Sequence, residues 1–396
     1  MRNVVMISDH SQAQNLFAPA GQEREGLKIQ IHRDAFLAEL ELLAEVVEPK
    51  NRLLAYSHLR MEAAGDRVIL QAAGFKNALQ CEAEALVLEE GVLCLPARKL
   101  REILRQLPSE MLTLNGDGSI AALQWGNSRF KINALSPDEF PEVPANDDFD
   151  LVIPREILLA MIRSTLFAAG KDDGTAHYAL NGARLIIGSE GARMIATDGH
   201  RLSYMRRADV RSDQTIDALI PRDALSAIPK LIGAFEGEVK IGLDENRIYF
   251  RTGARRLSCL LLTGQYPNCE SLLSQTFDQE LKIDAARFKE AIARMSIFGA
   301  SNSSQMFGLI KFHFAQDICE MLSADHNGGE GQEEITLLSV GPEQEITLSF
   351  NGRYLQDFAR TVSGSALVLK YNDENSSVEF SLADTNNEKY ILMPCR

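Results

Sequence analysis

The stretch PREILLAMIRSTLFAAG, residues 154–170, opens on proline, continues with apolar residues at helical spacing and ends on glycine. These are the marks of an amphipathic helix with defined boundaries. The same plan occurs in HRDAFLAELELLAEVVE at 32–48 and in DAARFKEAIARMSIFGA at 284–300. Alignment of Phe36, Leu158 and Phe288 places the copies 122 and 130 residues apart, which indicates a threefold internal repeat.

A second helix recurs at similar intervals, in PARKLREILRQLP (96–108), PRDALSAIPKLIGAF (221–235) and NGRYLQDFARTVSG (351–364). Each copy follows a strand-like segment and precedes a strand–turn–strand pattern, as in MLTLNGDGSIAALQW at 111–125. The sequence therefore predicts an α+β fold of three repeated domains, each with two helices covering antiparallel sheet. We place the domains at 27–148, 149–273 and 274–396, after an N-terminal extension at 1–26.

The composition is that of an ordinary globular protein of 396 residues, with 45% hydrophobic and 24% charged residues. Six cysteines form no CxxC pair, and no apolar run approaches the roughly 18 residues of a membrane span, so we expect reduced thiols and a cytoplasmic protein without a membrane partner. A net charge of −14 argues against nucleic-acid binding when taken alone.

The charge is unevenly distributed along the sequence. Five of the six predicted helices are net positive, and helix 96–108 carries +3, whereas helix 32–48 carries −4. This segregation favours a helical surface that meets phosphates while the rest of the molecule is acidic. The alternative, that helix surfaces simply carry Lys and Arg, stays open at this point.

The segment MIATDGHRLSYMRR (194–207) brings Asp198, Gly199, His200 and Arg201 together between apolar residues. A catalytic triad would need a nucleophile, and the sequence offers no elbow such as GxSxG. Zinc would need three or four ligands, and the seven histidines are scattered. We therefore predict a structural turn in which Asp198 accepts hydrogen bonds from backbone amides and Gly199 adopts a φ that other residues resist, with no cofactor or metal. A hydrolase that uses Asp198 and His200 is the alternative.

Several ordered motifs resemble one family. IATDGHRL (195–202), LPARKL (95–100), YALNG (178–182), FPEVP (140–144) and the terminal YILMPCR (390–396) together resemble the bacterial DNA polymerase III beta subunits, the replicative sliding clamps. The resemblance runs from Leu27 to Arg396. It implies a head-to-tail homodimeric ring around double-stranded DNA, which confers processivity in DNA replication and has no catalysis of its own. The implied partners are the DNA polymerase III catalytic subunit, the clamp loader, repair polymerases and mismatch-repair proteins.

The resemblance also implies three sets of site residues. The peptide-binding pocket would consist of Leu180, Thr197, Gly199, His200, Arg201, Leu202, Pro267, Leu272, Ile292, Asn351, Tyr354, Ser377, Ile391, Leu392, Met393, Pro394, Cys395 and Arg396. The DNA-facing residues would be Lys50, Arg52, Arg98, Arg105, Tyr178, Arg222, Lys230 and Arg360. The dimer interface would join Lys99, Ile103, Leu107 and Arg129 to Phe288, Glu330, Glu333 and Glu334.

The sequence also departs from the family pattern. Ser271 replaces a basic pocket residue, Asn375 replaces a valine, and the tail ends at Arg396 without a final leucine. These changes leave open a specialised second clamp copy for repair or mobile-element replication. A DNA-binding protein that sits on one face of the duplex is a further alternative.

Overall fold

A computed structural model of the chain describes residues 26–48, 51–149, 151–171, 178–233, 237–298, 308–324, 328–385 and 387–395. The predicted extension at 1–26 lies outside these ranges apart from Gly26. The chain forms two compact units: Met1–Ala73 with Cys81–Glu142, and Gly74–Gln80 with Val143–Arg396. Among the described helices, none combines the length and apolar character that crossing a bilayer requires.

The first repeat contains helices α2 (Arg33–Leu43) and α3 (Ala97–Gln106). The His32 ring caps α2 by accepting a hydrogen bond from Asp34 N, and Pro96 precedes α3. Its strands are β1 (Leu27–His32), β2 (His58–Ala64), β3 (Arg67–Ala73), β4 (Asn77–Glu84), β5 (Leu86–Glu89), β6 (Gly91–Pro96), β7 (Met111–Gly116), β8 (Ile120–Trp125) and β9 (Ser128–Asn133).

The second and third repeats lie in the second unit. The second contains β10 (Leu151–Pro154), α4 (Arg155–Thr165), β11 (Gly182–Gly188), β12 (Gly191–Thr197), β13 (Arg201–Arg207), β14 (Ile216–Pro221), α5 (Arg222–Ile232), β15 (Glu238–Leu243), β16 (Arg247–Thr252) and β17 (Arg255–Leu260). The third contains β18 (Gln279–Asp284), α7 (Ala285–Met295), β19 (Leu309–Ala315), β20 (Ile318–Ala324), β21 (Glu330–Thr336), β22 (Ile346–Asn351), α8 (Gly352–Ala359), β23 (Ala366–Tyr371), β24 (Val378–Leu382) and β25 (Glu388–Leu392). A segment with the short helix α6 (Glu270–Leu273) connects them.

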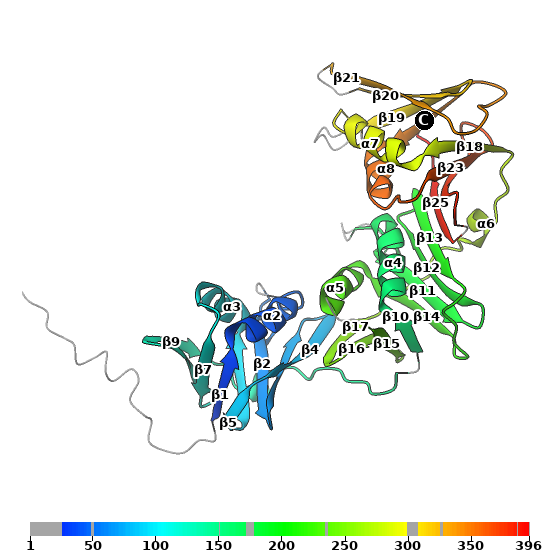
Figure 1. The fold of residues 1–396 in the computed structure, drawn as a ribbon. Helices are drawn as coiled ribbons and strands as arrows, with labels where there is room; N and C mark the ends of the chain where they lie inside the picture. Colours follow the sequence, from blue (N-terminus) through cyan, green and yellow to red (C-terminus); the bar gives the residue numbers. More distant parts are fainter. Residues whose placement is uncertain are drawn as a thin grey trace, which may run out of the picture. The chain divides into compact units, whose positions relative to one another are not determined.

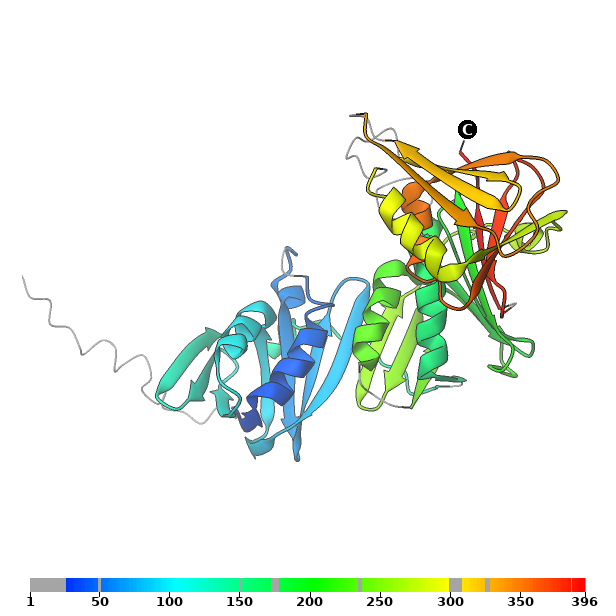
Figure 2. The same ribbon diagram turned by 45° about the horizontal axis from the view of Figure 1, so that its top comes forward.

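Each repeat is itself a doubled β-α-β-β-β unit. The strand before the first helix pairs with the strand after the second helix, in β1–β7, β10–β15 and β18–β23. The strand before the second helix pairs with the strand after the first, in β6–β2, β14–β11 and β22–β19. All these pairs are antiparallel, and the two helices of each repeat pack against each other (Figures 1 and 2).

The residues that aligned in the sequence are equivalent in the fold. Phe36, Leu158 and Phe288 are each 0% exposed and anchor the first helix of their repeat to its core. Around Phe288, the third repeat has an aromatic core in which the Phe312 and Phe350 rings lie 5.4 Å apart. This burial corrects the assignment of Phe288 to a dimer interface, because the side chain has no surface to offer a partner.

The predicted helices begin where expected and end earlier. Helix α4 ends at Thr165, where the hydroxyl donates to the Met161 carbonyl, and a 3-10 turn η3 (Leu166–Ala168) follows. In the same way Ser296, which follows α7, donates to the Ile292 carbonyl. Such back-bonding occupies the carbonyls near a helix end and favours its termination.

Candidate functional site

The Asp198–His200 turn joins β12 to β13 and is held by local hydrogen bonds. The Asp198 carboxylate accepts from the backbone amides of His200 (3.1 Å) and Arg201 (3.2 Å). The Thr197 hydroxyl donates to the Arg201 carbonyl (2.6 Å), and Gly199 has a φ of +92°. The prediction of a structural turn is therefore confirmed, in the roles assigned to both Asp198 and Gly199.

Arg201 is a buried brace between the second and third repeats. Its side chain is 5% exposed and forms ion pairs with Asp198 and with Asp357 of α8, each at 3.0 Å. It also donates to the Phe167 carbonyl (2.8 Å), and its guanidinium lies 4.2 Å from the centre of the Tyr354 ring. Burial opposes the charged form, but the surrounding negative charges outweigh it, so that the pKa of Arg201 is raised. The guanidinium therefore supports the turn from the protein interior, where a ligand cannot reach its charge.

The C-terminal strand runs beside the turn. β25 pairs with β13, so that Leu202 lies opposite Ile391, and the Met393 amide donates to the His200 carbonyl (3.2 Å). Beyond β25, the Cys395 amide donates to the Ser349 carbonyl (2.7 Å). The turn and the tail, far apart in the sequence, therefore form one continuous structure.

A cavity of about 740 Å³ opens beside this turn and is here called the turn pocket. It is lined by Ala179, Leu180, Asp198, Gly199, His200 and by Thr263, Gly264, Gln265, Tyr266, Pro267 and Asn268. His200 and Pro267 are exposed, and the Tyr266 hydroxyl fixes the wall by donating to the Ile195 carbonyl (3.1 Å). Its lining mixes apolar side chains such as Leu180 and Pro267 with polar ones such as His200 and Gln265, a combination that suits the capture of a short peptide.

The predicted pocket residues differ in their exposure. Leu180, Gly199, His200 and Pro267 line the turn pocket, and Leu272 and Met393 are exposed elsewhere on the surface. Eight further members are at most 7% exposed: Thr197, Arg201, Leu202, Ile292, Asn351, Ser377, Ile391 and Leu392. Three others are partly exposed: Tyr354, Pro394 and Cys395. Arg396 lies outside the described residues.

Three of these assignments are corrected by the packing. Ile292 is 0% exposed in the core of the third repeat, because it faces inward from α7. Asn351 caps α8 by accepting from the amides of Arg353 and Tyr354. Leu392 is 0% exposed within β25. These residues support the fold, and their exposed fractions, 0% for Ile292 and Leu392 and 5% for Asn351, leave little or no side-chain surface for a ligand.

The predicted DNA-facing residues also divide. Arg98 and Arg360 are exposed on α3 and directly after α8, with side chains 71% and 68% exposed. Arg105 forms an ion pair with Glu41 of the acidic helix α2 at 2.6 Å, which partly neutralises this surface. Arg52 and Lys230 are exposed, whereas Lys50 and the Tyr178 side chain lie outside what the structure describes.

Arg222, another member of that set, also makes contacts within the protein. Its guanidinium donates to the carbonyls of Leu166 (3.2 Å) and Ala169 (2.7 Å), and burial lowers its pKa, as does the nearby charge of Arg201. The side chain, which is partly exposed, therefore braces α5 against the segment after α4 through its Nη1.

Two edge strands carry all the charged residues of the predicted interface except Lys99. β9 ends the sheet ordered β5-β1-β7-β8-β9 and bears exposed Arg129 and Lys131. β21 ends the sheet ordered β21-β20-β19-β22 and bears Glu330 and Glu334, both exposed. Glu333, also on β21, pairs with Arg294 of α7. On α3, Lys99 is exposed, Ile103 is half-buried, and Leu107, just after the helix, is 7% exposed.

Several polar groups of the turn are already engaged with one another. The Asp198 carboxylate is occupied by two amides and Arg201, and the Thr197 hydroxyl is committed to a backbone carbonyl. Within the described ranges, no group of three His, Cys, Asp or Glu side chains could hold a metal ion.

Three repeats of paired helices on antiparallel sheets, with a pocket beside the second repeat, define a clamp-type architecture. Family models of the DNA polymerase III beta subunit match residues 27–144 (N-terminal domain), 152–268 (central domain) and 270–396 (C-terminal domain). The chain therefore belongs to the DNA polymerase III beta subunit family.

Individual relatives agree over nearly the whole chain. The beta sliding clamp of Pseudomonas aeruginosa is 28% identical over 375 residues, covering 92% of this chain and 99% of the relative. That of Synechococcus elongatus is 26% identical over 378 residues, covering 93% and 99%. The crystal structure of the Pseudomonas aeruginosa DNA polymerase III subunit beta superposes with a TM-score of 0.84 at 26% identity, covering 93% of this chain and all of that one.

Some residues of the site were missed by sequence reasoning. Tyr266 and Thr263 line the turn pocket, and Asp357 and Phe167 hold Arg201. The Tyr-Pro pair at 266–267 parallels the Phe-Pro pair at 140–141 near the end of the first repeat and is a usable signal for Tyr266. Nothing local marks Asp357, because its partner is 156 residues away in the sequence.

Proposed function

We propose that this chain is a DNA sliding clamp, a non-catalytic accessory subunit that closes as a head-to-tail homodimer around duplex DNA and tethers the replicative polymerase. The match of all three repeats to the three domains of the beta subunit family carries the proposal. The clamp loader, repair polymerases and mismatch-repair proteins are the further partners we expect at the turn pocket, in the cytoplasm.

Complementary edge strands support head-to-tail pairing. An edge strand presents unpaired backbone groups and is a template for another chain. The basic edge β9 of one chain and the acidic edge β21 of a second chain would extend one sheet across the interface. Opposite charges on the two edges favour this pairing over β9–β9 or β21–β21 contacts. Because the contact is heterologous, it yields a closed ring when the rotation closes and open filaments when it does not.

Charge reversal tests the interface. Reversing β9 by Arg129→Glu with Lys131→Glu places like charges on both edges, and we expect the solution mass to fall from twice the 43.9 kDa chain mass to that of a monomer. Adding Glu330→Lys and Glu334→Lys in the same chain restores complementarity and the dimer. Lys311→Glu, on the exposed face of β19, is the matched control. A wild-type chain with the solution mass of a monomer would contradict the proposed dimeric ring.

Encirclement is tested by topology. Protein loaded on closed circular DNA should be retained in moderate salt and lost after the circle is linearised, because a ring slides off an end. A protein bound to one face of the duplex would instead be retained by both forms and show a steep salt dependence. Equal loss from the two forms refutes encirclement.

The turn pocket is tested with a fluorescein-labelled peptide from the C-terminal tail of a DNA polymerase III catalytic subunit. His200→Ala and Leu180→Ala remove side chains that line the pocket, and we expect each to weaken binding about tenfold. Arg211→Ala, exposed on the loop before β14, should bind as the wild type does. Unchanged affinity in both pocket variants would remove this site from the proposal.

A further inference from the structure

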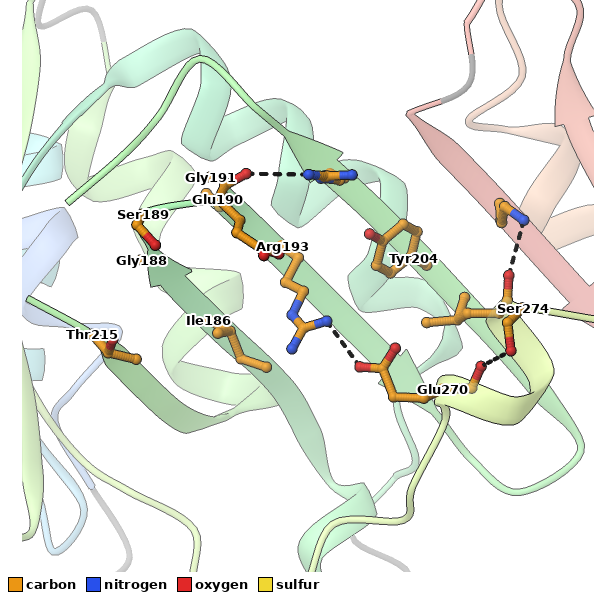
Figure 3. Close-up of a pocket in the computed structure, with 14 residues that line it drawn as sticks. Ile186, Gly188, Ser189, Glu190, Gly191, Arg193, Tyr204, Thr215, Glu270 and Ser274 are labelled. Atoms are coloured by element: carbon orange, nitrogen blue, oxygen red, sulfur yellow. Dashed lines mark hydrogen bonds and ion pairs between the residues drawn. The ribbon is translucent and has the colours of Figure 1, made fainter. Parts of the chain in front are cut away.

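A second cavity, of about 470 Å³, lies on the sheet of the second repeat and is here called the arginine pocket. It is formed by the ends of β11, β12 and β13, by α6, and by Lys389 of β25. Figure 3 shows Arg193 extending from its strand to Glu270 of α6, with Tyr204 beside them. No residue of the peptide-binding set implied by the family resemblance lines this pocket.

Two like charges face each other across its floor. Arg193 of β12 lies directly opposite Arg206 of β13, an arrangement that costs free energy when the charges are uncompensated. Glu270 pairs with Arg193 at 2.8 Å. The Arg206 side chain donates to the Glu190 carbonyl (3.3 Å) and, in the ranges that the structure covers, takes part in no ion pair.

The pocket as a whole is positive in an acidic chain. Its cations are Arg193, Arg206 and Lys389, and its carboxylates are Glu190 and Glu270. Lys389 is already held by the buried Glu379 at 2.9 Å, which leaves Arg206 as the cation most open to a ligand. Burial raises the pKa of Tyr204, against the effect of the two arginines, so its hydroxyl remains a neutral donor.

The side of the sheet decides which ligand can reach this pocket. Side chains of β13 alternate between the two faces, and Ser203, whose hydroxyl donates to the Ser164 carbonyl of α4 (2.5 Å), faces that helix. Tyr204 and Arg206 therefore lie on the face away from α4. Because the proposed DNA contacts are on the helices, the ligand here is expected to be protein. Thr263–Asn268 line the turn pocket and Glu270, Leu273 and Ser274 line the arginine pocket, so one connecting segment borders both sites.

We propose that the arginine pocket binds an acidic side chain of a protein that is docked at the turn pocket. The carboxylate would bridge Arg206 and Arg193, displacing Glu270, whose side chain is 61% exposed, and would accept from the Tyr204 hydroxyl. Ile186 and Leu273 supply an apolar floor for the neighbouring peptide residue. This inference rests on the proposed function, since it gives clamp partners a second contact.

The test uses the full chain and two labelled peptides, Glu-Glu-Leu-Glu-Glu and Gln-Gln-Leu-Gln-Gln, followed by fluorescence anisotropy at low salt. The acidic peptide should bind, the amide peptide should not, and Arg206→Gln should weaken the acidic peptide at least fivefold. Arg211→Gln is the control, because it removes an exposed arginine outside the pocket. Equal binding of both peptides, or an unchanged affinity in Arg206→Gln, overturns the proposal.

The polymerase-tail peptide separates this result from the proposed function. Arg206→Gln should leave its affinity unchanged, since that peptide occupies the turn pocket. If the tail peptide fails to bind the wild type while the acidic peptide depends on Arg206, the clamp partner assignment fails and the arginine pocket stands. If the tail peptide binds the wild type and the acidic peptide does not depend on Arg206, only the proposal for the arginine pocket fails.

Discussion

Arg201 and Arg206 occupy the same strand, β13, and face opposite sides of its sheet. On the inner face Arg201 is buried, with two carboxylates, a carbonyl and an aromatic ring around it. On the outer face Arg206 is exposed and reaches one carbonyl. The same side chain is a brace in one place and a candidate ligand contact in the other, because the environment of each face decides whether the charge is already satisfied.

Removal of the inner arginine should have the largest effect. Arg201→Met leaves Asp198 and Asp357 without their shared partner, and we expect the free energy of unfolding to fall by about 3 kcal/mol. Urea denaturation measures this loss. Arg201→Lys keeps the charge but loses the planar guanidinium group. Its free energy of unfolding should lie between those of the wild type and Arg201→Met. A loss below about 1 kcal/mol would show that the brace is not needed.

The turn that Arg201 supports gives the next effect. Gly199→Ala forces a residue with a side chain to adopt a left-handed φ, and we expect the free energy of unfolding to fall by about 1–2 kcal/mol. A Cβ at this glycine would meet nothing within 4 Å, so the cost is conformational and not steric. Gly199→Asn is the control, since asparagine tolerates this region better and should lose less. Equal unfolding curves for the alanine variant and the wild type would contradict the assignment.

The outer arginine should matter least to stability. Arg206→Gln removes an exposed charge that opposes Arg193, so we expect the unfolding free energy to change by no more than about 0.5 kcal/mol, in the stabilising direction. The same urea series measures it beside Arg201→Met. If the two variants were equally destabilised, the contrast between the faces would be wrong.

A pH series tests the contribution of an ion pair, Arg184–Asp217, on the outer face. The hydrogen bonds from Arg184 lower the pKa of Asp217, although partial burial opposes the shift. Because the folded-state pKa lies below the unfolded value of about 4, the pair stabilises the protein above that pH and loses its effect as pH falls through the folded-state pKa. Asp217→Asn should therefore be slightly less stable than the wild type at pH 7 and equal to it near pH 2. A difference that persists at pH 2 would point to another cause.

The helices of this protein were predictable because their signal is local. Helical spacing marked all six long helices, and prolines marked the starts of α3, α4 and α5. The alignment on Phe36, Leu158 and Phe288 found equivalent core residues. The structural role of Asp198 followed from its position before Gly199. The domain boundaries at 148 and 273 stay predictions.

Burial was the part of the site that the sequence could not supply. Ile292 and Phe288 were placed at surfaces by analogy, yet both face inward from α7. Arg222 has the sequence context of an exposed helix start, but its donors meet carbonyls contributed by the segment after α4. In each case a long-range neighbour, invisible to a local pattern, determines where the side chain points.

By itself the amino-acid sequence determined the threefold repeat, the helix starts and the Asp198–Gly199 turn, because periodicity, capping and turn chemistry act within a few residues of the chain. Only the tertiary structure decided that each repeat is a doubled β-α-β-β-β unit, that β9 and β21 are edges, and that Arg201 is buried while Arg206 is open. Strand order and sheet face depend on pairing between distant segments, which no local pattern specifies.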